Sequence, residues 1–190
     1  MATIKRKGYG QVEPNHLSGI VTGQIYAQLP ATSTVSGTET PIAQLEQGQF
    51  LIYDYANGRA TYAGDGEPML VYCEEKLYDE RYQSHKDFVL KATDFTDGKI
   101  FPRLIKTNVG DIYTTNTFEA NTSNTAVTSG VTIAEGNYLQ YNDSTGFLAV
   151  ATSSGSAVSS MSGLTGMVWK VVKIYTMPDG QQGVKIQRVQ

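Results

Sequence analysis

Turn-forming residues divide the chain from Gln47 onward into short apolar or alternating runs, and this spacing constrains the fold more than any other feature. Runs of about four to eight residues between such turns are typical of strands in an antiparallel sandwich or barrel. The sequence therefore predicts an all-β fold. The turns that we identify are Ala56-Asn-Gly-Arg59, Gly64-Asp-Gly66, Asp97-Gly98, Asn108-Val-Gly110, Asp143-Ser-Thr-Gly146 and Pro178-Asp-Gly180.

Three segments give more specific expectations. Asn57-Gly58 predicts a type I′ hairpin turn after a strand at residues 50–55, because both residues tolerate positive φ. Residues 167–175 are rich in β-branched and aromatic side chains and predict a central strand, which residues 184–187 should join as a C-terminal hairpin. The charged segment 74–86 fits either one or two helical turns or a long solvated loop.

One strand-turn-strand unit occurs twice. Shifting the chain by 88 residues places Gly48-Gln-Phe-Leu-Ile-Tyr-Asp-Tyr-Ala-Asn-Gly58 over Gly136-Asn-Tyr-Leu-Gln-Tyr-Asn-Asp-Ser-Thr-Gly146. In each copy a glycine begins the strand, apolar side chains pack, and a glycine closes the turn. We interpret the repeat as a duplicated hairpin with a structural role. The shared positions are Gly48, Leu51, Tyr53 and Gly58 in the first copy, and Gly136, Leu139, Tyr141 and Gly146 in the second.

The repeat and the composition predict three regions. Residues 1–40 are polar and interrupted by glycine, which indicates an extended N-terminal arm with at most a short strand, or else a disordered tail. Residues 41–118 form a first β unit, and residues 119–190 form a second that contains the repeated hairpin. The Ser/Gly-rich tract 152–162 in the second unit is expected to be a mobile loop. The two units are either related subdomains or halves of one sandwich or barrel.

The charge of the chain argues against nucleic-acid binding, since a net charge of −3 and a pI near 5.4 leave no broad basic surface for phosphates. The basic run Lys5-Arg6-Lys7 is expected to be a solvated tail, with contact to nucleic acid or an acidic partner as the alternative. The longest apolar runs are far shorter than the ~20 residues of a membrane span, and the N-terminus lacks a signal-peptide core. We therefore expect a soluble chain made in the cytoplasm.

Candidate catalytic groups are few. His16, His85 and Cys73 do not have the spacing of zinc ligands, and a lone cysteine excludes an intrachain disulfide. The acidic pairs are Glu74-Glu75, Asp79-Glu80 and Asp94 with Asp97, and interleaved basic residues make them typical of solvated surfaces. We expect no enzyme activity, metal or cofactor. A β-sandwich hydrolase that uses these acids is the least favoured alternative.

The chain resembles the accessory head proteins of tailed phages, which are the decoration, cement and head-fibre-base proteins. The resemblance rests on the polar N-terminal segment, the hairpin 48–63, Val109-Gly-Asp-Ile-Tyr-Thr-Thr-Asn116, Gly166-Met-Val-Trp-Lys-Val-Val-Lys-Ile-Tyr-Thr176 and Gly183-Val-Lys-Ile-Gln187. It implies a virion protein on the capsid exterior that binds the major capsid protein, often as a trimer. The family has no catalytic residues to carry over.

From this resemblance we expect the N-terminal region to supply contacts with the capsid or with a neighbouring subunit. The candidate contact residues are Lys5, Arg6, Lys7, Tyr9, Ile20, Val21, Ile25, Tyr26 and Leu29. The alternative function is a carbohydrate-binding or host-attachment β domain in which exposed tyrosines, of 12 in the chain, stack on sugars.

Overall fold

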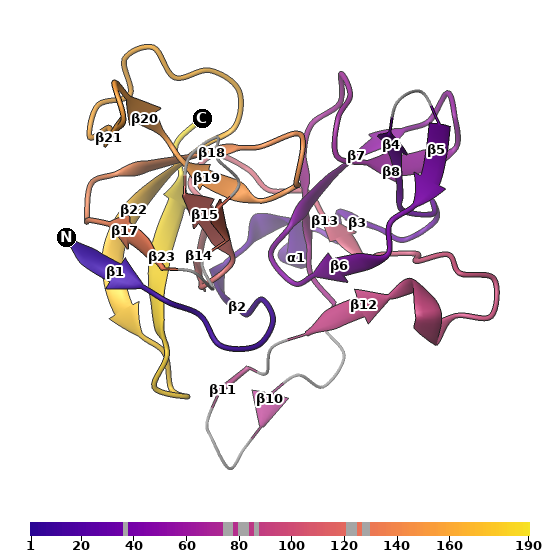
Figure 1. The fold of residues 1–190 in the computed structure, drawn as a ribbon, viewed down its shortest axis with the longest axis horizontal. Coiled ribbons are helices and arrows are strands. Elements are labelled where there is room, and N and C mark those ends of the chain that lie inside the picture. Colours follow the sequence, from indigo (N-terminus) through magenta and orange to yellow (C-terminus); the bar gives the residue numbers. More distant parts are fainter. Residues whose placement is uncertain (36–37, 74–77, 80–83, 86–87, 121–124, 127–129) are drawn as a thin grey trace.

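The computed structural model describes residues 1–35, 38–73, 78–79, 84–85, 88–120, 125–126 and 130–190. Strands make up nearly all of the regular secondary structure in the described residues, with a short helix α1 (Ser18–Val21) and a single 3₁₀ turn η1 (Ala92–Asp94). The prediction of an all-β fold is confirmed (Figure 1). No helix in the described part of the chain is long and apolar enough to cross a membrane.

Two large sheets lie side by side (Figure 1). The first sheet has five strands in the spatial order β3 (Ile25–Tyr26), β13 (Leu104–Ile105), β9 (Met69–Val71), β7 (Phe50–Asp54) and β8 (Arg59–Thr61). The second sheet has eight strands in the order β16 (Thr125–Ala126), β15 (Phe118–Ala120), β19 (Leu148–Val150), β18 (Tyr138–Tyr141), β22 (Val168–Thr176), β23 (Gln182–Arg188), β14 (Ile112–Thr115) and β2 (Val12–His16).

Two-stranded ladders complete the fold. They pair β1 (Ala2–Ile4) with β17 (Val131–Ile133), β4 (Thr32–Val35) with β5 (Thr38–Pro41), β6 (Gln44–Glu46) with β12 (Val89–Lys91), β10 (Tyr78–Asp79) with β11 (Ser84–His85), and β20 (Thr152–Ser153) with β21 (Ser156–Ala157).

The two sheets share one strand order. The first sheet contains β3, β7, β8, β9 and β13, named in chain order. Their spatial order across the sheet is β3-β13-β9-β7-β8. In the second sheet β14, β18, β19, β22 and β23 lie in the matching order β14-β23-β22-β18-β19. The duplication therefore extends well beyond the hairpin that the sequence repeat identified.

The registers agree as well. In the first hairpin Ile52 pairs with Thr61, and 88 residues later Gln140 pairs with Ala149. The leading strands of the two sheets also match, because Ile25-Tyr26 of β3 and Ile112-Tyr113 of β14 each follow a glycine with positive φ by two residues. This correspondence has a shift of 87 residues, so the 88-residue alignment did not detect it.

In both halves the chain that follows the leading strand pairs with the last strand of the matched order, which is β8 in the first sheet and β19 in the second. Ala31, which follows β3, forms a parallel bridge with Ala60 of β8. β15, which follows β14, pairs in parallel with β19. Each sheet therefore curls toward closure, which is the arrangement of a small barrel.

The N-terminal segment is built into the second sheet. β2 extends that sheet by pairing with β14, and β1 pairs with β17 (Figure 1). β17 is the counterpart of β6, whose partner in the first half is β12. The expectation of at most a short strand in residues 1–40 is wrong, because β1, β2, β3 and β4 all lie there. The apolar side chains of Ile4, Val12 and Leu17 are buried in the core and hold this segment on the fold.

Strand membership divides the chain differently from the expected boundaries at residues 40 and 118. β3 lies within residues 1–40 but belongs to the first sheet, and β14 lies before residue 118 but belongs to the second. A division into two β units remains a proposal, and its boundaries should follow the sheets.

One continuous core joins the sheets. Phe50 of β7 packs against Trp169 of β22 with ring centroids 6.2 Å apart, and Trp169 meets Tyr113 of β14 edge-on at 5.0 Å. Leu70 and Ile105 of the first sheet belong to the same buried cluster. Because this cluster draws aromatic rings from both sheets, their burial couples the two halves, while a second cluster around Tyr53 belongs to the first sheet.

The expected central strand and C-terminal hairpin are confirmed, since β22 lies between β18 and β23. The type I′ turn at Asn57-Gly58 is wrong, because Asn57 does not have positive φ. Asp54 accepts hydrogen bonds from the backbone and side chain of Asn57 and from Arg59, and this network stabilises a four-residue turn between Asp54 and Arg59.

Two further segments contain short hairpins. In the tract 152–162, which we expect to be a mobile loop, Ser154 and Gly155 have φ of 51° and 81° and join β20 to β21. In segment 74–86 the strands β10 and β11 form an antiparallel ladder, so their residues are not helical. Residues 74–77, 80–83 and 86 lie outside the described part of the chain.

Gly10 provides a test of how tightly the N-terminal segment is held. A Cβ atom at Gly10 would lie 2.1 Å from the Gln47 carbonyl oxygen and 2.4 Å from Thr117 Oγ1. We expect Gly10→Ala to lower the free energy of unfolding by about 1–3 kcal/mol or more, because the contacts are with backbone and a buried side chain. Gly64→Ala is the control, since its Cβ would meet only Ile52 at 3.5 Å. Urea titration that finds equal stability for the two variants would contradict this packing.

Candidate functional site

The candidate contact residues fall into two groups, and the first group is mostly internal. Arg6 is only 5% exposed, and its guanidinium pairs with the Glu46 carboxylate at 2.7 Å. The expectation of a solvated tail is therefore wrong for Arg6, because its charge is neutralised inside the fold. Lys5 and Lys7 are exposed, and Tyr9 is half-buried with the Lys91 ammonium 5.4 Å from its ring centre.

Residues 6–12, which we call the crossing segment, bridge the two halves. The N–H of Gly10 donates to Glu46 Oε2 at 3.0 Å, and the Gly10 carbonyl accepts from the N–H of Phe88 at 3.1 Å. Gln11 donates from its backbone to Asn116 Oδ1 at 2.9 Å and from its side chain to Asp179 at 2.8 Å. The crossing segment therefore makes its contacts within this molecule.

The second group lies at the surface of the first sheet. Val21, at the end of α1, is 81% exposed, while Ile25 and Tyr26 of β3 are half-buried. Ile20 and Ile25 pack against the shared core, and Tyr26 and Leu29 against a second cluster. We call residues 21–28 the open edge, because no described strand pairs with the outer side of β3.

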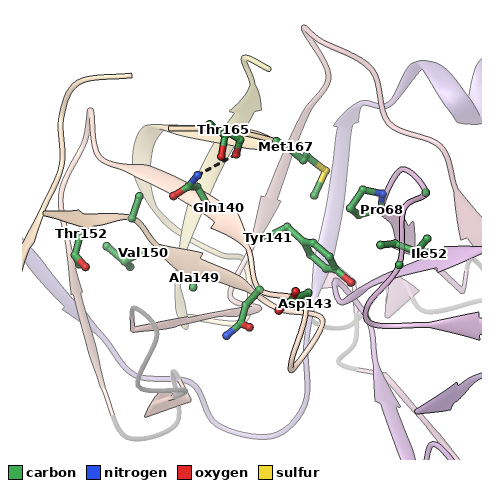
Figure 2. A pocket seen from close by; sticks show the side chains of 15 residues that line it. Ile52, Pro68, Gln140, Tyr141, Asp143, Ala149, Val150, Thr152, Thr165 and Met167 are labelled. Carbon is green, nitrogen blue, oxygen red and sulfur yellow. Dashed lines mark hydrogen bonds between the residues drawn. The ribbon is translucent and has the colours of Figure 1, made fainter. Parts of the chain in front are cut away.

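One cleft lies between the two sheets, and Figure 2 shows Tyr141 of the second sheet reaching toward Ile52 of β7 and Pro68, which precedes β9. This cleft has a volume of about 550 Å³. Gln140 donates a hydrogen bond to the Thr165 carbonyl at 3.0 Å on its far wall (Figure 2). Among the described residues that line it, Asp143 alone carries a charge, so the cleft lacks the carboxylate pair of a glycosidase.

The residues of the repeated hairpin have different environments in the two copies. Leu51, Tyr53 and Leu139 are buried, and Tyr141 is half-buried with its hydroxyl donating to the Tyr62 carbonyl. Burial raises the pKa of Tyr62 to about 12 and the pKa of Tyr141 still further. Both hydroxyls are therefore neutral at physiological pH.

The glycines of the repeat show where the second copy contacts the first half. All four of these glycines have positive φ: Gly48, Gly58, Gly136 and Gly146. A Cβ at Gly58 or Gly136 would meet open space, whereas a Cβ at Gly146 would lie 2.8 Å from the Phe50 carbonyl oxygen. The Gly146 carbonyl also accepts from the N–H of Phe50 at 2.7 Å. The turn of the second hairpin thus docks on the start of β7.

Glu119 supports this docked turn and was missed by the sequence analysis. Its side chain is 2% exposed, and its Oε1 accepts hydrogen bonds from Asn142 at 2.5 Å and from Thr145 at 2.9 Å. Burial raises the pKa of Glu119 above its ordinary value, although these two bonds oppose the shift. An isolated acid in a single sequence gives little signal of such a role.

The remaining candidate catalytic or metal-binding residues, where the structure describes them, lie in separate parts of the fold. His16 lies exposed on β2, Cys73 is half-buried, and Asp94 and Asp97 are exposed at the turn after β12. Glu74, Glu75 and Glu80 lie outside the described residues, as do the side chains of Asp79 and His85. Within the described residues, no group of three or more potential metal-binding side chains gathers at one point.

The tyrosines give limited support for sugar binding. Among those whose side chains are described, Tyr55 alone is fully exposed, at 71%. Its ring meets Tyr53 edge-on at 5.4 Å, and Tyr53 meets Tyr26 in the same manner at 5.3 Å. Most described tyrosines therefore pack within the fold.

Comparison of the chain with protein-family models, with curated proteins and with solved structures finds no match.

The ion pair of Arg6 and Glu46 should be important for stability. Replacing one partner leaves the other charge buried, so we expect Arg6→Met to lower the free energy of unfolding by about 3–5 kcal/mol. Lys106→Met breaks a half-exposed pair with Glu67 at 3.3 Å and should cost at most about 1 kcal/mol. Equal losses in denaturant titrations of the two variants would contradict the buried pair.

Glu119 predicts a pH dependence of stability. Because its folded-state pKa is raised, the folded protein takes up a proton before the unfolded chain does as the pH falls, and this group then adds stability. Glu119→Gln keeps the accepting oxygen but removes the buried charge. The variant should gain stability relative to the native protein as the pH rises through the folded-state pKa of Glu119.

Thermal melts from about pH 5 to pH 8 test this effect, with Asp65→Asn as an exposed control that removes the same charge. A difference between native protein and Glu119→Gln that does not change with pH would contradict the assignment.

Proposed function

We propose that this chain is a structural virion protein that binds the outer surface of a tailed-phage capsid, with the major capsid protein as its partner. In this proposal it acts without catalysis or cofactor and assembles as a homo-oligomer, with a trimer favoured. The sequence resemblance to accessory head proteins supplies the functional class.

The observation that carries the proposal is the position of the second group of candidate contact residues. Val21, Ile25 and Tyr26 lie together at the open edge of the first sheet, where one side chain is exposed and two are half-buried. An exposed sheet edge beside apolar side chains is suited to protein contact. Within the first group, Arg6 is committed to Glu46, so its charge is used inside the fold.

The rest of the fold is consistent with a reinforcing role. A shared core and a crossing segment couple the two halves, so force applied at one face is transmitted through packed side chains. Many copies on a shell would add avidity even if each contact is modest.

Shell binding can be tested with a single exposed side chain. Val21→Asp places a charge at the open edge, and its 81% exposure means that folding should be nearly unaffected. We expect binding to purified undecorated phage shells to weaken about tenfold or more, as measured by co-sedimentation. Val172→Asp, at a 45% exposed position on β22 of the second sheet, is the matched control.

Two results would oppose the proposal. Native protein that does not bind undecorated shells would contradict the function itself. Equal weakening by Val21→Asp and Val172→Asp would contradict the location of the contact.

A further inference from the structure

The duplicated fold shows one strand position filled in the second sheet and vacant in the first. In the second sheet the leading strand β14 has a neighbour on each side, with β23 on one and β2 on the other. In the first sheet the leading strand β3 has β13 on the matching side and no described strand on the other. We propose that the vacant position beside β3 binds an extended segment of a partner protein, which adds to the first sheet as a strand.

The backbone of the open edge is oriented for such pairing. Gln24 accepts a hydrogen bond from Lys106, and the paired residues continue as Ile25 with Ile105 and Tyr26 with Leu104. Residues of an antiparallel strand direct their N–H and C=O groups to alternate sides. Since Gln24 faces β13, Ile25 faces outward, and its N–H donates to the Gly23 carbonyl at 2.8 Å. The same alternation, continued one residue past β3, turns the N–H and C=O of Ala27 outward.

The equivalent residue in the second sheet shows the occupied state. Thr114 follows Tyr113 as Ala27 follows Tyr26, and it pairs with Glu13 of β2. Thr114 is 1% exposed beneath its neighbours, whereas Ala27 is exposed. Residues 12–16 therefore serve as a template for the occupant, which is an extended segment that carries an apolar side chain toward the core, as Val12 does.

The outer strands of the two large sheets are poor donors for a second copy of this chain. β2 contains Pro14, which lacks an N–H, and β16 has two residues. The outer side of β8 is already bridged by Ala31. Resting on the function proposed above, we assign the occupant to an extended segment of the shell protein, recognised by backbone pairing.

Substitutions at Ala27 test this strand-binding position on undecorated shells. Ala27→Pro removes the outward N–H, and Ala27→Lys places a charge that disfavours strand addition while keeping the N–H. We expect each to weaken shell binding about tenfold or more. Thr38→Lys, at an exposed position of β5, controls for the added charge.

The outcomes separate this inference from the proposed function. If the native protein does not bind shells, both the proposed function and the strand-binding position are contradicted. If the native protein and both Ala27 variants bind shells equally well, only the strand-binding position is contradicted. If thermal melting shows that Ala27→Pro is unfolded, the shell binding of Ala27→Lys alone tests the strand-binding position. Loss of self-association rather than of shell binding in Ala27→Lys, seen by sedimentation velocity, would contradict the assignment to a shell protein and indicate a second copy.

Discussion

The packing of Phe50 against Trp169 is the contact on which the two-sheet structure depends. Phe50 comes from the first sheet and Trp169 from the second, and both are fully buried in one cluster. Removing large aromatic surface from water at this single point makes the halves stable together. The turn that Gly146 closes fits against the same strand, so the duplicated hairpin of the second half serves as a joint as well as a framework.

The N-terminal residues gain a different role from the one that their composition indicated. A polar, glycine-rich segment normally suggests an arm that is free to reach a neighbour. Here Gly10 passes so close to Gln47 that only glycine fits, and Arg6 is held by Glu46. Because the crossing segment uses its hydrogen bonds internally, we propose the open edge as the surface for partners.

Hydrophobic alternation and turn residues in the sequence predicted the features that depend on residues close together in the chain. The β fold, the long strand at residues 167–175 and its hairpin follow from alternation and turn residues, as does the repeat. The four-residue turn after Asp54 was missed, because it depends on side-chain hydrogen bonds that outweigh the preference of Asn-Gly. The pairing of β2 with β14 joins residues about a hundred positions apart, which periodicity cannot indicate. The open edge is visible only once the two sheets are compared strand by strand.

We propose that the open edge of the first sheet engages a phage shell. Electron cryo-microscopy of undecorated shells incubated with this protein tests this contact most directly. We predict density on the capsid exterior in which the first sheet faces the shell and one additional strand lies beside β3. Particles without added density, or density that meets the shell through the second sheet with β3 facing solvent, would contradict it.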